Sequence, residues 1–193
     1  MQKFVVVVVL LGLFSLPLMA QKAEVFGGYQ YLRLNNIGDS NSGIDVNANG
    51  WDTSLTGYFN KFFGLTGDFS GAYATFNVPN KGNPVSVSGH TYTYSGGPVI
   101  AFREGPVHPF VHVLFGGVHE AVTVPGGCNG SCSQNGFTTM FGGGVDVRVN
   151  KAIAVRIAEF DWVYYNFSSQ IGGGSSYSES GNVRITTGIV LRF

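Results

Sequence analysis

Charged side chains are scarce in this 193-residue chain: Asp, Glu, Lys and Arg make up 11% of it, against about 25% in an average soluble domain. Basic and acidic residues are equal in number, 11 of each, so no nucleic-acid partner is indicated. Beyond residue 20 there is no apolar run of the roughly 20 residues that a membrane-spanning helix needs. Low charge without a spanning helix favours a membrane protein built from strands.

Cysteine is almost absent as well, with Cys128 and Cys132 the only two in the chain. No cysteine stands directly after the N-terminal apolar segment, where a lipid anchor would be attached, so a lipid anchor is not expected there. Both cysteines fall in the motif GGCNGSC, in a predicted loop of an exported protein, so a disulfide between them is expected in an oxidising compartment. A metal site would need more ligands than this segment offers, and no cofactor is expected.

The first 20 residues predict a secretory signal peptide. Lys3 supplies the positive start, residues 4–18 form a short apolar core, and Ala20 ends the segment. A transmembrane anchor is the alternative, but the run is short and no basic flank follows it. We therefore expect an exported domain over residues 21–193.

Residues 183–193 alternate between two faces. One face carries Val183, Ile185, Thr187, Ile189, Leu191 and Phe193. A period of two indicates a pleated strand with different environments on its two sides. The same pattern recurs seven times upstream and predicts eight strands, at about 25–34, 51–59, 63–73, 91–103, 110–118, 141–148, 153–164 and 183–193.

Two of these strands have irregular features. Pro98 lies inside a strand, where it removes a ladder hydrogen bond, so a local bulge is expected there. In the strand that begins at Ile153 the apolar face switches sides after Ala158. Because one extra residue reverses the facing, a bulge near Ala158 is also predicted.

The connections alternate between tight turns and long loops. Long polar stretches are predicted at 35–49, 78–89, 122–136 and 168–181, whereas the other three connections are short. Only a sheet closed on itself satisfies its backbone groups in hydrocarbon, and this asymmetry of connections is typical of bacterial outer-membrane barrels. The predicted fold is all-β: an eight-stranded antiparallel up-and-down transmembrane β-barrel with its apolar face outward. A soluble ligand-binding barrel is the alternative, with apolar side chains around a central cavity.

With the apolar face outward, the polar face fills a lumen only wide enough for side chains. Buried charges persist when they are paired, so a lumen charge network of both signs is expected. Its predicted members are Asp68, Asp146, Arg148, Arg156, Glu159, Asp161 and Arg184. Further lumen candidates are Asp52, Arg103, His112 and Arg192. The same residues suit structural filling or a narrow gated conductance.

Five segments in this order resemble the family of small outer-membrane barrels related to the OmpA transmembrane domain. These segments are 25–33, 51–71, 109–117, 141–167 and 188–193. The resemblance implies a Gram-negative outer membrane, periplasmic chaperones during export, and insertion by the barrel-assembly machinery with Phe193 as part of the terminal signal. The periplasmic domain of full-length OmpA has no counterpart here, so peptidoglycan binding is not implied.

The four histidines do not predict an enzyme. Lipid A-modifying barrels place a His and a Ser near the rim with an orienting carboxylate, which requires nucleophile and base within hydrogen-bond reach. Within the strand ranges predicted above, no His and Ser lie two apart on one face. We expect a monomeric membrane protein with a structural or surface-contact role. A narrow pore and an adhesin acting through the long loops stay open as alternatives.

Overall fold

The structure of the chain is a computed structural model. The signal peptide predicted at 1–20 lies outside the part that it describes. The described residues are 22–35, 45–78, 85–123, 132–167 and 177–193.

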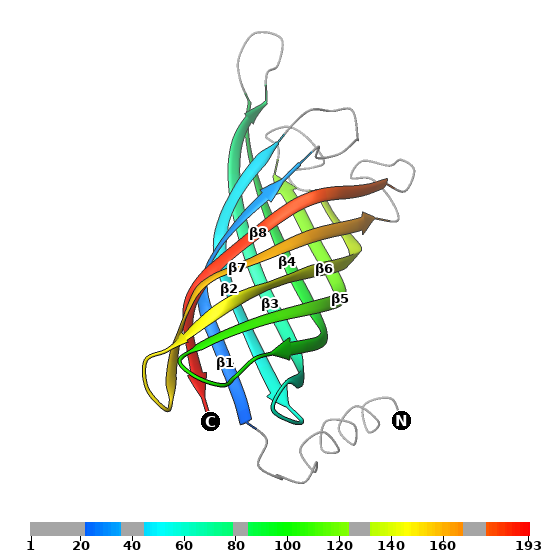
Figure 1. Cartoon of the computed structure of the whole chain (residues 1–193). Helices are drawn as coiled ribbons and strands as arrows, with labels where there is room; N and C mark the ends of the chain where they lie inside the picture. The colour runs from blue at the N-terminus through cyan, green and yellow to red at the C-terminus, as the bar shows by residue number, and fades with distance from the viewer. Residues whose placement is uncertain (1–21, 36–44, 79–84, 124–131, 168–176) are drawn as a thin grey trace, which may run out of the picture.

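Eight antiparallel strands close into one barrel in sequence order (Figure 1). Closure is made by β1 and β8, which pair along their length with Val25 opposite Leu191. The strands are β1 (Lys22–Leu34), β2 (Val46–Tyr58), β3 (Phe63–Val78), β4 (Val85–Ala101), β5 (Val107–Thr123), β6 (Cys132–Arg148), β7 (Ile153–Phe167) and β8 (Tyr177–Arg192). The predicted architecture is therefore confirmed.

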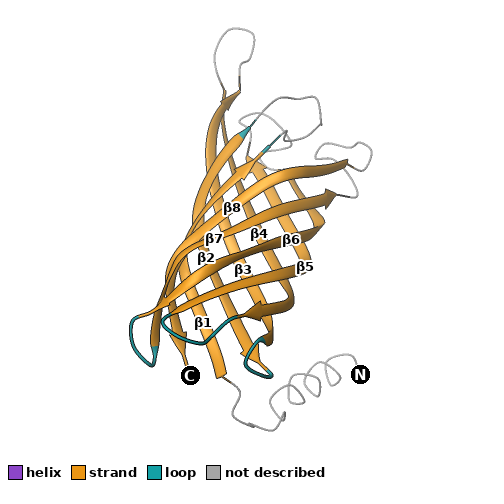
Figure 2. Ribbon diagram, viewed as in Figure 1, coloured by secondary structure: helices purple, strands orange, loops and turns teal. Residues whose placement is uncertain are grey.

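Three short turns join the strands at one end of the barrel, drawn in teal in Figure 2. Two of them use the same device. Asn60 Oδ1 accepts hydrogen bonds from the N–H groups of Phe62 and Phe63, and Asn150 Oδ1 accepts them from the N–H groups of Ala152 and Ile153. The asparagine side chain thus satisfies backbone donors that the tight turn would leave without partners.

At the opposite end the strands are longer than predicted. β2 begins at Val46, β3 extends to Val78 and β6 begins at Cys132. The sequence there is polar and rich in Gly, Ser and Asn, which favours a loop assignment. The ladder needs only backbone groups, however, so a hairpin continues beyond the apolar belt without apolar side chains.

The bulge predicted near Ala158 is confirmed. The register between β7 and β8 shifts between Arg156 and Glu159, and Ile157 and Ala158 are exposed one after the other. A second shift, near Gly181 with its positive φ of 84°, was not predicted.

The bulge expected at Pro98 is wrong. Leu65 pairs with Pro98 in an unbroken β3–β4 register. On the other side, the β4–β5 pairing runs to Gly96 opposite Phe115 and resumes in the same register at Val99 opposite His112. The missing N–H therefore interrupts a few pairings without inserting a residue.

Many large apolar side chains of the strands point outward, whereas the charged ones of the lumen are buried. Leu55 is 60% exposed and Ile189 55%, whereas Asp68 is 6% and Arg156 7% exposed. A soluble barrel would show the opposite arrangement, and this exterior suits contact with acyl chains. No helix in the described ranges has the length and apolar character needed to cross a membrane.

Candidate functional site: the barrel interior

Arg184 crosses the interior from β8 to β3. Its Nη1 and Nη2 donate to the two carboxylate oxygens of Asp68 at 2.9 and 3.3 Å, and its Nε donates to Asp161 Oδ2 at 2.7 Å. The fork of a guanidinium matches a carboxylate in this bidentate geometry. A single cation therefore ties together three strands.

Arg156 forms a second centre nearer the turn end. Its Nε and Nη2 donate to Asp146 at 2.8 and 3.2 Å, and its Nη1 donates to Glu159 Oε2 at 2.6 Å. The guanidinium lies between the rings of Phe26 and Phe110, at 4.2 and 4.4 Å from their centroids. Arg156 and Glu159 both face inward because the β7 bulge separates them.

His112 on β5 links the two centres. Its Nε2 is 2.7 Å from Asp161 Oδ1 and 3.6 Å from Glu159 Oε1. The Thr186 hydroxyl donates to Glu159 Oε2 at 3.0 Å. Among the described histidines, His108 bonds to the backbone oxygen of Gly105 and His119 to the side chain of Asn135.

Asp52 is the least compensated group in the described interior. Both of its carboxylate oxygens are buried without a hydrogen-bond partner, and its nearest cation is Arg184, with Nη1 at 3.7 Å from Oδ2. The interior network therefore holds five carboxylates (Asp52, Asp68, Asp146, Glu159 and Asp161) against two arginines (Arg156 and Arg184). Carboxyl groups outnumber the arginines in this network.

The structure brings together six of the seven residues predicted to form the lumen network, all but Arg148. Arg148 shares the inward parity of Asp146, but it lies at the rim beside the turn at 149–152 and is exposed to solvent. Its prediction as a network member is corrected. Parity alone identifies the face of a strand and not the depth along it.

A smaller cluster at the turn end was missed in part. Glu24 Oε1 accepts hydrogen bonds from Arg103 at 2.9 Å and from Arg192 at 2.8 Å, and Arg192 Nη1 is 3.1 Å from His108 Nδ1. Arg103 and Arg192 were predicted lumen residues, whereas Glu24 was not. The signal was present, because Glu24 shares the parity of the inward-facing Gln30.

An apolar layer fills the interior on the loop side of the charges. Its fully buried members include Leu32, Leu114, Val118, Met140, Val163 and Phe167. The sequence predicted a polar lumen and did not indicate this apolar layer. The interior is therefore layered, with charged groups between apolar clusters.

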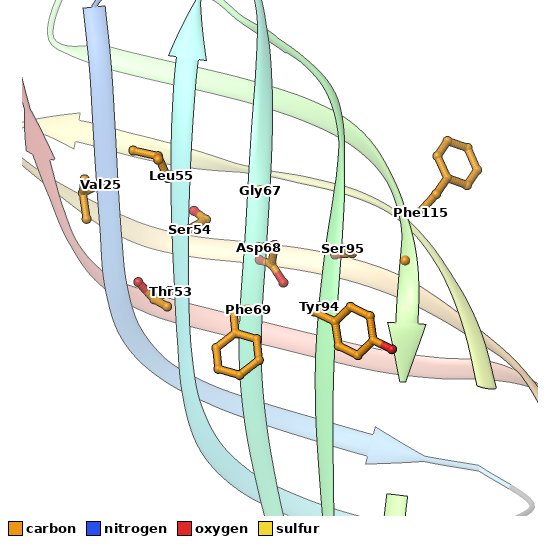
Figure 3. Close-up of a pocket in the computed structure, with 11 residues that line it drawn as sticks. Val25, Thr53, Ser54, Leu55, Gly67, Asp68, Phe69, Tyr94, Ser95 and Phe115 are labelled. Carbon is orange, nitrogen blue, oxygen red and sulfur yellow. The ribbon is translucent and has the colours of Figure 1, made fainter. Parts of the chain in front are cut away.

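The exterior has a shallow depression on β3 and β4 (Figure 3). Gly67 lies opposite Gly96, and in the same cross-strand row Leu55 and Phe115 flank this glycine pair. Figure 3 shows the rings of Phe69 and Tyr94 beside it, on the same side of the sheet. The depression belongs to the apolar surface of the barrel.

Cys132, the first residue of β6, is disulfide-bonded. Cys128 lies outside the described residues, so its pairing with Cys132 stays a proposal. With two cysteines in the chain, this pairing is the simplest.

Comparison with known proteins finds similarity in fold alone. No protein-family model matches the chain, and no curated protein matches it in sequence. Ail, the attachment invasion locus protein of Yersinia pestis, superposes with a TM-score of 0.56 at 17% identity, over 90% of this chain and 99% of that one. The chain has the fold of small outer-membrane β-barrels.

Two further solved structures support the same fold assignment. Neisserial surface protein A gives a TM-score of 0.54 at 12% identity, covering 90% of this chain and 97% of that chain. OprG of Pseudomonas aeruginosa gives 0.52 at 10% identity, covering 89% and 95%. At these identities the likeness establishes the fold, and the OmpA-like family remains a resemblance.

Proposed function

We propose that this chain is an integral outer-membrane protein of the OmpA-like kind, with a side-chain-filled barrel that supports surface contact at its loop end. The observation that carries the proposal is the combination of an apolar exterior with a packed interior. Such a barrel offers a rigid base, and its strand ends opposite the tight turns would be presented at the membrane surface. We do not propose an enzyme.

Surface contact is also consistent with one structural relative. Ail is named for attachment and invasion, and its structure was solved in complex with a heparin analogue. For this chain, an adhesive role would belong to the segments between strands at the loop end. The barrel itself would insert through the assembly machinery, with β8 and Phe193 as the terminal signal, and would act as a monomer.

Shortening those segments tests the proposal. Residues 36–44, 79–84, 124–131 and 168–176 would be replaced one at a time by Gly-Ser turns, and adhesion of expressing cells to a heparin-coated surface measured. Loss of adhesion with an unchanged heat-dependent gel shift supports surface contact. Unchanged adhesion in all four variants, compared with cells lacking the protein, contradicts it.

A narrow pore is a second candidate, because an ionisable network lies across the lumen. It predicts single-channel currents in planar bilayers that change in Asp146→Asn or Arg156→Gln. The apolar layer around Leu114 opposes ion passage, so we expect the wild-type barrel to give no steady current.

A further inference from the structure

Three donor atoms converge in the middle of the barrel. Asp161 Oδ2 accepts a hydrogen bond from Arg184 Nε, and Asp161 Oδ1 lies 2.7 Å from His112 Nε2. Glu159 Oε2 accepts a hydrogen bond from Arg156 Nη1, and Glu159 Oε1 lies 3.6 Å from the same His112 nitrogen. These three atoms lie within 4.8 Å of one another, and all three residues are buried.

We propose that His112, Glu159 and Asp161 bind a divalent transition-metal ion, with Zn²⁺ as the reference ion. One imidazole nitrogen and two carboxylate oxygens are a ligand set that zinc accepts, at distances of about 2.0–2.2 Å. Donors around a tetrahedral ion of that size lie roughly 3.4 Å apart. The separation of His112 Nε2 from Glu159 Oε1, 3.6 Å, is close to this value, whereas Asp161 Oδ1 lies 2.7 Å from His112 Nε2 and must move away from it to admit an ion.

The charge of the interior supports a bound cation independently of this geometry. Asp52 has a fully buried side chain without a hydrogen bond, and Arg184 links it to the cluster: Arg184 Nη1 is 3.7 Å from Asp52, and Arg184 Nη2 is 3.8 Å from Glu159. Five carboxylates share two arginines in this network. Because buried charge is costly without compensation, a doubly charged cation would offset carboxylate charge that the two arginines leave uncompensated.

There is also room beside the donors. A cavity of about 10 Å³, lined among others by His112, Glu159, Asp68 and Thr66, lies on the turn side of the cluster. This is close to the smallest volume that holds one water molecule. A water there would complete a fourth coordination position next to the three protein ligands.

The test uses the full barrel refolded in detergent after treatment with a chelator, with and without ZnCl₂. We expect one equivalent of zinc to stay bound through desalting and to raise the unfolding temperature. In His112→Gln, which keeps an amide to bond with Asp161, we expect at least a tenfold weaker affinity. His119→Gln is the matched control, since His119 is a partly exposed histidine bonded to Asn135 and outside the cluster.

Two results would overturn the site. One is wild-type protein that retains no zinc; the other is retention that falls equally in His112→Gln and His119→Gln. Folding of each variant is checked by its gel shift before and after boiling. If His112→Gln does not fold, Glu159→Gln takes its place, and it too must lose zinc while His119→Gln keeps it.

Discussion

Arg184 shows how one residue organises this interior. It is fully buried and holds Asp68 and Asp161 through three hydrogen bonds, with Asp52 beside it. Such a buried ion network adds little to the free energy of folding compared with an apolar core of the same shape. Removing one partner, however, leaves the other groups charged and buried. Its role is therefore revealed by deletion.

We expect Arg184→Met to lower the free energy of unfolding by about 3–5 kcal/mol, because three carboxylates lose their cation. Urea unfolding in detergent micelles measures this. Arg33→Met is the control, since the Arg33–Asp45 pair is about half exposed and a pair of that kind contributes about 0.2–1 kcal/mol. Equal losses in the two variants would contradict the role of the network.

Two glycines on opposite faces give a second prediction at this scale. A Cβ on Gly142 would overlap Asp161 Oδ1 and the backbone oxygen of Phe160, whereas a Cβ on Gly67 would meet no atom within 4 Å. Gly142→Ala should destabilise the barrel by about 1–3 kcal/mol through overpacking. Gly67→Ala should leave the stability unchanged or raise it slightly. Thermal unfolding of both variants, with reversal of this order as the contrary result, checks the assignment of faces.

Among the elements, β7 depends most on an irregularity. In a regular strand, residues three positions apart point to opposite faces. The bulge allows Arg156 and Glu159, which have this spacing, to face the interior together. If the same sequence continued through Ala158 as a regular strand without a bulge, one half of the strand would turn its carboxylates to the outside.

Deleting Ala158 should therefore leave the facing of both halves of β7 intact, because Arg156 and Glu159 would then lie two positions apart and both point inward. The deletion protein should fold and show the same heat-dependent gel shift as the wild type after refolding in detergent. Ala158→Val keeps the residue count and should also fold. A deletion variant without the gel shift would mean that the bulge itself is required, beyond its effect on the facing of the side chains.

The sequence predicted the elements well where lipid imposes a strict pattern. Strand number, facing and the β7 bulge follow from the alternation of side chains such as Leu55 and Asp68. The strand ends opposite the tight turns, such as those at Val46 and Cys132, were not predicted. Outside the lipid, backbone hydrogen bonds between strands form without an apolar face, so the sequence carries no alternation there. The charged partners were found by parity, whereas the position of Arg148 at the rim and the apolar layer around Leu114 depend on depth and strand tilt, which parity does not encode.

For the molecule as a whole, the decisive property is the apolar belt. Leu55 and Phe59 both point outward and are similarly exposed, at 60% and 62%, but Phe59 lies beside the turn end. Leu55→Arg should cost up to about 2–4 kcal/mol in a bilayer, and Phe59→Arg about 0–1 kcal/mol. Unfolding in lipid vesicles measures both. Similar costs at the two positions would place the belt elsewhere.

The seam between β1 and β8 has a consequence for the order of assembly. Seven of the eight strand pairings join neighbours along the chain, but the eighth joins its first strand to its last, as in the bond from the Phe193 N–H to the Ala23 oxygen. Until β8 arrives, two rows of peptide groups are open, and hydrocarbon offers them no partners. A partly delivered chain therefore has no stable resting place in the bilayer, and some other surface must shelter both edges until the ring is complete.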